Sequence, residues 1–144
     1  MNVERLTVRS RQALQKALEG ARSRGHQALE SAHVLKALLS DREGMAVALV
    51  KKLGVSESEL SAALDEELNR LPLVKGAGGQ MYEGRSFTAL MDAAEAASKQ
   101  LKDEFISAEH FLLGALAEGN AALKRGGLTK DTLLKSLQEV RGSQ

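Results

Sequence analysis

The chain has 144 residues, of which 43% are hydrophobic, 27% are charged and 3% are aromatic. With 20 basic against 19 acidic residues, it lacks the positive excess on which binding to a nucleic-acid backbone depends. It contains no cysteine, which excludes a disulfide framework, cysteine-ligated metals and thiol catalysis.

The sequence has no apolar run of about 18 residues, the length that a membrane-spanning helix needs. Its first residues lack the basic and hydrophobic segments of a signal peptide. We therefore expect a cytoplasmic protein that neither enters a membrane nor binds nucleic acid. The length suits one compact domain with a hydrophobic core.

The composition predicts an all-α fold, because strong helix formers dominate and proline occurs once. Apolar residues at steps of three and four predict helices over residues 4–23, 31–40 and 45–53. A fourth helix is predicted after Ser56, which forms a capping box with Glu59. Its apolar face carries Leu60, Leu64 and Leu68.

Pro72 interrupts this pattern, and glycines 76, 78, 79 and 84 follow it. We expect the stretch up to residue 86 to cross the surface without secondary structure. Helical periodicity then predicts helices over 87–101, 107–117, 121–125 and 129–140. Ser107 and Thr129 suit the N-caps of two of them, and Gly126-Gly127 suits a C-cap.

The two halves of the chain are related by an internal repeat. When residue 33 is placed on residue 110, HVLKALL (33–39) superposes on HFLLGAL (110–116), and the predicted helices follow in the same order. We interpret the chain as two pseudo-symmetric four-helix repeats packed into one domain. The first covers about 1–70 and the second about 87–142, with a connection over 71–86.

The repeats differ at positions that share this register. Ala32 and Lys36 of the first repeat correspond to Glu109 and Leu113 of the second. His26 corresponds to Asp103, and Ala28 to Phe105. All four aromatic residues lie in the second repeat or just before it: Tyr82, Phe87, Phe105 and Phe111.

Two of these differences have alternative interpretations. Leu113 either faces a binding partner or covers the seam between the repeats or the connection over 73–86. The carboxylates of Asp103 and Glu109 either cap a helix start or form an acidic rim around an apolar patch that includes Met91. Such a rim suits a peptide with an aliphatic or aromatic side chain and a lysine or arginine.

No set of residues predicts catalysis. His26, His33 and His110 are the only histidines, and we expect His33 and His110, which occupy equivalent positions near helix starts, to donate hydrogen bonds to neighbouring carbonyls and to pack between helices. We also expect no metal site, since Glu109 and His110 are adjacent and point about 100° apart on a helix. No phosphate-binding loop precedes a lysine and a helix, so we expect no nucleotide site.

Five stretches of the sequence are distinctive: Arg5-Leu6-Thr7, GHQAL (25–29), ELNRLPLVKGAGG (67–79), DEFISAEHFLLGAL (103–116) and the ending EVRGSQ. In these stretches the chain resembles the N-terminal domain of the Clp AAA+ chaperones, the double Clp repeat. The resemblance covers the whole chain and is most specific for ClpB-type protein disaggregases.

The resemblance implies a non-catalytic module that binds exposed hydrophobic segments of unfolded or aggregated polypeptides. It also implies a hexameric parent whose separate ATPase modules bind ATP and magnesium, so we expect no cofactor in this chain and a monomeric isolated domain. Thr7, Asp103 and Glu109 match surface positions of the family. The residues that we expect to bind peptide are Thr7, Met91, Asp103, Phe105, Glu109, His110 and Leu113.

One departure from the wider family limits the prediction. ClpC-type domains have an acidic residue in each repeat that helps to receive phosphoarginine, whereas this chain has Ala32 at the first site and Glu109 at the second. We therefore do not expect specific phosphoarginine binding. The alternative function is an adaptor-docking domain of a ClpA- or ClpC-like unfoldase that feeds a protease.

Overall fold

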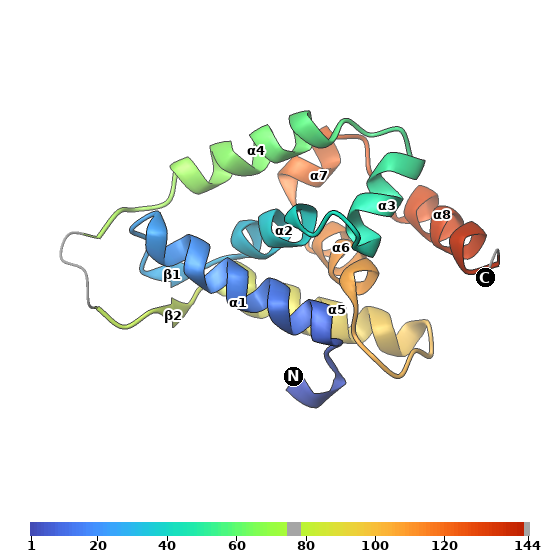
Figure 1. Ribbon diagram of the computed structural model, residues 1–144, viewed down its shortest axis with the longest axis horizontal. Coiled ribbons are helices and arrows are strands. Elements are labelled where there is room, and N and C mark those ends of the chain that lie inside the picture. The colour runs from blue at the N-terminus through green and yellow to red at the C-terminus, as the bar shows by residue number, and fades with distance from the viewer. Residues whose placement is uncertain (75–78, 143–144) are drawn as a thin grey trace.

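The helices of the two halves follow one another in the same order of length (Figure 1). The computed structural model describes residues 1–74 and 79–142. The first four helices have 16, 10, 8 and 13 residues: α1 (Val8–Ser23), α2 (Ser31–Ser40), α3 (Met45–Lys52) and α4 (Glu57–Asn69). The next four have 16, 10, 5 and 13 residues: α5 (Arg85–Gln100), α6 (Ala108–Ala117), α7 (Ala121–Arg125) and α8 (Lys130–Gly142). This arrangement confirms the predicted all-α fold, and we call α1–α4 the first repeat and α5–α8 the second.

The start of the chain differs from the helix predicted from residue 4. A 3-10 helix, η1 (Val3–Arg5), is followed by an extended Leu6, which bridges to Ile106. Leu6 is buried, and α1 begins only after Thr7, whose side chain accepts a hydrogen bond from the Ser10 N–H. The prediction was wrong here because the partner of Leu6 is distant in the sequence.

The predicted helix ends are confirmed where side chains or glycine determine them. Ser56 caps α4 by accepting a hydrogen bond from the Glu59 N–H, and Thr129 accepts one from the Thr132 N–H. Gly127 adopts a φ of 86° after α7, a conformation that favours glycine.

Helices α2 and α6 form the centre of the fold. Seven of the ten residues in each are buried, which their nearly continuous apolar sequences predict. Gly114 lets α6 approach α5 closely, since a Cβ atom there would lie 2.8 Å from the Ala94 backbone nitrogen. The first repeat has Ala37 at the corresponding position.

The connection between the repeats contains secondary structure that the sequence did not reveal. Strand β2 (Tyr82–Glu83) pairs in parallel with β1 (Ala28–Leu29), which corrects the expectation of a connection without it. Only two residues pair on each strand, too few for a periodic pattern. Gly76 and Gly78, which belong to the predicted connection, lie outside the described residues, as do residues 143–144.

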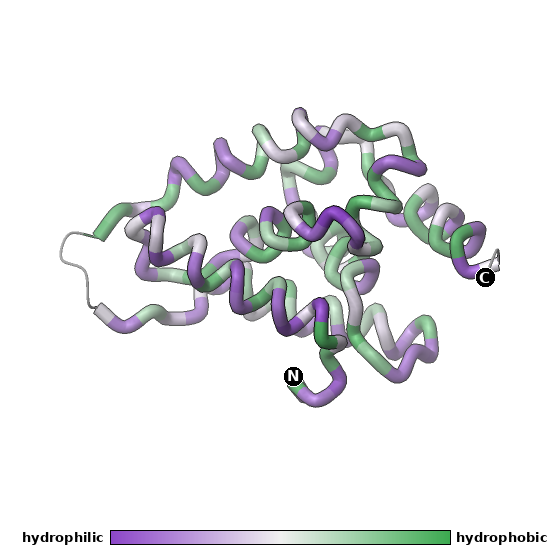
Figure 2. The backbone as a smooth tube through the Cα atoms, in the orientation of Figure 1, coloured by the Kyte–Doolittle hydropathy of each residue, from purple (hydrophilic) through white to green (hydrophobic). Residues whose placement is uncertain are grey.

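The outer helices are amphipathic. Figure 2 shows hydrophilic and hydrophobic segments alternating along α1 and α4. Their buried residues recur at steps of three and four, as in Ala13, Ala17 and Ala21 of α1. Within 1–74 and 79–142, no helix has the length and apolar character needed to cross a membrane.

Candidate functional site

A groove of about 490 Å³ opens where the first turns of α1, α3 and α6 meet. Apolar side chains from three elements line it: Val8 from α1, Leu38 from α2 and Met45 from α3. Val8 is 69% exposed although it is apolar, whereas Leu38 is buried. Thr7 and Glu109 contribute polar atoms. The groove therefore offers apolar surface beside hydrogen-bonding groups.

One arginine and two carboxylates meet at one edge of the groove, so their charges cancel only in part. The Arg9 guanidinium lies 2.8 Å from Asp41 and 3.6 Å from Glu43. The Asp41 hydrogen bond raises the pKa of Arg9 above its already high ordinary value. All three residues line the groove, so this edge presents one positive and two negative charges.

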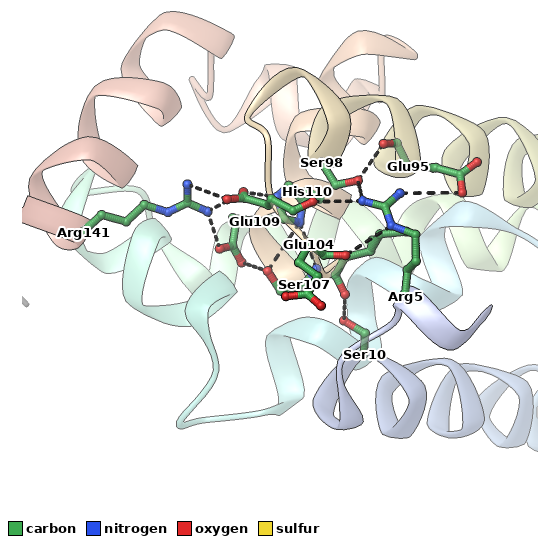
Figure 3. Close-up of polar contacts among 11 residues, drawn as sticks. Arg5, Ser10, Glu95, Ser98, Glu104, Ser107, Glu109, His110 and Arg141 are labelled. Carbon is green, nitrogen blue, oxygen red and sulfur yellow. Dashed lines mark hydrogen bonds and ion pairs between the residues drawn. The ribbon is translucent and has the colours of Figure 1, made fainter. Parts of the chain in front are cut away.

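At the other edge, one arginine holds two carboxylates (Figure 3). Arg141 reaches from the end of α8 and donates hydrogen bonds of 2.8 and 3.3 Å to the two oxygens of Asp103. The same guanidinium donates to Glu109 at 3.2 Å. The two carboxylates of the predicted acidic rim therefore lie close together, but Arg141 is bound to both of them.

His110 supports this cluster from inside. Its Nδ1 accepts a hydrogen bond from the Ser107 N–H at 2.9 Å, so its proton lies on Nε2, 2.7 Å from Asp103. The ring is 1% exposed. The expected interhelical packing is present, but the expected hydrogen bond is different: the histidine accepts from the backbone and donates to a carboxylate.

The pKa of Asp103 reflects two opposing effects. Its burial by itself would raise the pKa, but hydrogen bonds from Arg141 and His110 more than offset this, so the pKa is lowered. The Asp103 hydrogen bond in turn raises the pKa of Arg141. Asp103 is therefore a stable carboxylate at neutral pH, as a structural ion pair requires.

The loop before α6 is fixed to the N-terminal segment from the opposite side (Figure 3). Arg5 donates hydrogen bonds to the carbonyls of Asp103 and Glu104, and Ser10 donates to that of Ile106. These contacts hold Phe105 in a loop where half of its surface remains exposed.

The structure brings together only part of the predicted set. Thr7 and Glu109 line the groove, whereas Phe105 is half exposed in the loop before α6 and does not line it. Met91 and Leu113 are 9% and 7% exposed and belong to the core. The alternative that Leu113 covers an internal seam therefore describes its position, because α6 is enclosed by both repeats.

Sequence reasoning missed Val8, Leu38, Met45 and Arg141. Val8 had a detectable signal, since it is an apolar residue at the first position of a helix whose buried face lies elsewhere. Arg141 had none, because its carboxylate partners lie more than 30 residues away. Among the residues that the structure describes, no group of three or more histidine, cysteine, aspartate or glutamate side chains is arranged to hold a metal ion.

The family model described as "Clp repeat (R) N-terminal domain" matches residues 5–126. The chaperone protein ClpB of Porphyromonas gingivalis is 34% identical over an alignment of 144 positions, gaps included, that covers 98% of this chain and 16% of that protein. The Clostridium perfringens ClpB is 34% identical over an alignment of 152 positions that covers 100% of this chain and 18% of that protein. The chain thus spans less than a fifth of the length of these relatives.

Two solved structures are similar in fold. The N-terminal domain of Hsp104 from Candida albicans has a TM-score of 0.80 at 21% identity, covering 96% of this chain and 93% of that one. A complex of the ClpV N-domain with a VipB peptide has a TM-score of 0.78 at 17% identity, covering 94% and 86%.

Proposed function

Because the chain belongs to the Clp repeat N-terminal domain family, we propose that it is the substrate-binding module of a ClpB-like ATP-dependent disaggregase. In this proposal it engages exposed hydrophobic segments of unfolded or aggregated polypeptides in the cytoplasm. The module itself is non-catalytic. ATP and magnesium act in other modules of a hexameric parent.

The groove between α1, α3 and α6 is the observation that carries the proposal. Its apolar side chains include Val8, whose exposure to water is unfavourable until another apolar group covers it. At each edge one arginine binds two carboxylates, which leaves a net negative charge that favours segments with a lysine or arginine beside the apolar group. A groove with these properties suits many unfolded chains.

Two comparisons support this interpretation. The two relatives named above, each 34% identical to this chain, are ClpB chaperones. A domain of the same fold, the ClpV N-domain, has been solved with a peptide of VipB. A groove of modest size predicts weak binding, with a Kd of about 1 μM to 1 mM, which several copies in a ring would strengthen by avidity.

We assign different roles to the predicted residues. Thr7, Glu109 and Phe105 are placed to contact a bound segment, together with Val8, Leu38 and Met45. Met91 and Leu113 support the site from the core. Asp103 and His110 position the guanidinium of Arg141 beside Glu109.

The test is an NMR titration of the ¹⁵N-labelled chain with reduced, carboxymethylated α-lactalbumin, which stays unfolded. The backbone amides of Thr7, Val8, Met45 and Glu109 should shift. The variant Val8→Ser should weaken binding several-fold, because it removes the most exposed apolar side chain of the groove.

The matched control is Leu73→Ser. Leu73 is also apolar and is 73% exposed, but it lies near the start of the connection and does not line the groove. It should bind as the unchanged chain does. If Leu73→Ser weakens binding and Val8→Ser does not, or if the shifts cluster around Arg11 and Arg22 of α1, which do not line the groove, the groove is not the site. Binding only of a folded adaptor would favour the alternative function.

A further inference from the structure

Two buried histidines contact each other in the first repeat. His26 Nδ1 and His33 Nε2 are 2.8 Å apart, and their rings meet edge to face. The two residues are 5% and 3% exposed, so water does not solvate the pair. A hydrogen bond between two imidazoles requires one of them to donate and the other to accept.

The backbone determines which ring donates. The Glu30 N–H donates to His33 Nδ1 at 2.9 Å, so the proton of His33 must lie on Nε2. His33 therefore donates to His26 Nδ1, and the proton of His26 lies on Nε2, where a hydrogen bond to the Leu68 backbone uses it. The chain of hydrogen bonds is complete only when both rings are neutral.

A proton added to either ring breaks this chain. On His26 Nδ1 it would face the Nε2 proton of His33, and on His33 Nδ1 it would face the Glu30 N–H. Burial accordingly lowers the pKa of both histidines, and that of His33 falls to about 4. Every protonated state leaves two buried donors opposed.

The cations around the pair oppose a proton, and the nearby carboxylates are bound by other groups: Glu30 accepts hydrogen bonds from the His33 backbone N–H and from Ser86. Arg24, at the end of α1, lowers the pKa of both rings. Lys16 of α1 and Lys36 of α2 line the same hollow as His33. The carboxylate of Asp65 on α4 is bound by Arg24 at 2.9 Å and by Lys36 at 3.1 Å.

The pair lies beside the anchors of the connection. The Val74 N–H donates to the Gly25 carbonyl and the Tyr82 N–H to the Gln27 carbonyl, each at 3.0 Å. Gly25 and Gln27 flank His26. The hydrogen bond of His26 also reaches the backbone of Leu68, at the end of α4. Any movement of His26 therefore acts on both ends of the connection.

We propose that the His26–His33 pair is an acid-sensitive lock, which holds Val74 and Tyr82 against the first repeat and releases them when it is protonated. The second repeat contains its own control: Asp103 occupies the position of His26, and His110 that of His33. An Asp oxygen and a His Nδ1 branch from the same Cγ, so aspartate presents an acceptor in a similar place. A carboxylate at this position would stabilise a protonated imidazole next to it, whereas a neutral imidazole would not.

The direction of the pH effect follows from the lowered pKa. An unfolded histidine takes up a proton near pH 6.5, whereas folded His33 resists it until about pH 4. Between these values the unfolded state binds more protons, so stability decreases as the pH falls. For His33 alone, the folding equilibrium constant should fall roughly 20-fold from pH 7 to pH 5.

The test compares the unchanged chain with His26→Asp and His26→Asn. Urea unfolding at pH 7 and pH 5 should show that His26→Asp loses most of this pH dependence. His26→Asn keeps a neutral acceptor, so His33 should still resist protonation. In the unchanged chain, exchange of the Val74 and Tyr82 amides, corrected for the intrinsic rate, should accelerate at pH 5 relative to that of Thr7, which bonds Ile106.

A second measurement does not depend on the variants. At pH 7, the ¹⁵N signals of the His26 and His33 imidazoles should show His33 with its proton on Nε2. The signals of these two rings should not titrate near pH 6.5. Titration of His33 near pH 6.5 in the folded chain would overturn the proposal. Equal loss of stability in the unchanged chain and His26→Asp, or unchanged exchange at Val74 and Tyr82, would also overturn it.

Discussion

The starts of α2 and α6 share one arrangement of hydrogen bonds but differ in charge. In both, a buried histidine accepts a hydrogen bond from the backbone N–H three residues earlier, at 2.9 Å. In the first repeat its other nitrogen meets a neutral His26, and in the second it meets the carboxylate of Asp103. The same helix cap thus closes a neutral core in one repeat and anchors an ion-pair cluster beside a surface groove in the other.

The comparison shows how a duplicated unit can acquire a site. The histidine and the helix start are common to both repeats, so they serve the fold. Asp103 stands at the position that corresponds to His26 and carries a negative charge. This charge binds Arg141 of α8. Substitutions of Gly114, Asp103 and Arg141, each compared with a matched control variant, test how far the two repeats differ.

The largest effect is expected from Gly114→Ala. A Cβ atom would lie 2.8 Å from the Ala94 backbone nitrogen and 3.2 Å from the Ala93 Cβ, so α5 and α6 would have to separate. We expect a loss of about 2–3 kcal/mol in the free energy of unfolding, measured with urea.

The first repeat supplies the matched variant. Ala37→Gly should cost only about 1 kcal/mol, which is the difference in helix propensity between alanine and glycine. The Cβ atom of Ala37 is already accommodated in α2, so its removal relieves no clash. A loss below about 0.5 kcal/mol for Gly114→Ala would mean that the close approach of α5 and α6 is not required.

A smaller loss is expected from Asp103→Ala. The substitution leaves the buried Nε2 of His110 without its acceptor and removes two hydrogen bonds from Arg141. We expect about 2 kcal/mol, measured by thermal and urea unfolding. Glu104→Ala is the control, since Glu104 is exposed and Arg5 uses its backbone carbonyl; it should change stability by less than about 0.5 kcal/mol. Equal effects would show that the cluster adds no stability.

The smallest effect is expected in the pH dependence of stability. The Asp103–Arg141 ion pair and the His26–His33 pair contribute to it in different pH ranges. Because the folded pKa of Asp103 is lowered, its contribution is complete above the ordinary value of 3.8 and is lost as the pH falls through the folded value. The ¹³C carboxyl signal of Asp103 should therefore titrate below pH 3.8, whereas the histidine pair acts between about pH 6.5 and 4.

Arg141→Gln should raise the pKa of Asp103, because the hydrogen bond from this guanidinium lowers that pKa more than any other contact does. Arg125→Gln, which removes the partner of Glu66 instead, should leave it unchanged. An Asp103 signal that does not respond to Arg141→Gln would contradict the ion pair.

The sequence was informative where the signal is local or periodic. The prediction of residues 31–40 as a helix agrees with α2 at both ends, and Ser56 and Thr129 were found as caps because their partners are three residues away. Leu6 was misassigned because its partner is Ile106. The β1–β2 pair was missed because two residues have no periodicity.

The candidate site was predictable only in part. The difference between the repeats correctly drew attention to Asp103 and Glu109, which lie next to each other in the fold around one guanidinium. The same difference at Leu113 has two meanings, exposed or enclosed, and the sequence pattern is identical for both. The apolar residues Val8, Leu38 and Met45 come from three helices, so no single stretch marks their groove.

By itself, the sequence determined the all-α fold, the repeated order of helices and most helix ends, because hydrogen bonds and apolar contacts within a helix join residues three or four apart. The tertiary structure alone decided whether the carboxylates were free or paired. Arg141 stands 38 residues from Asp103 and 32 from Glu109. A contact over such distances depends on how α8 packs on α6, and no local pattern encodes that packing.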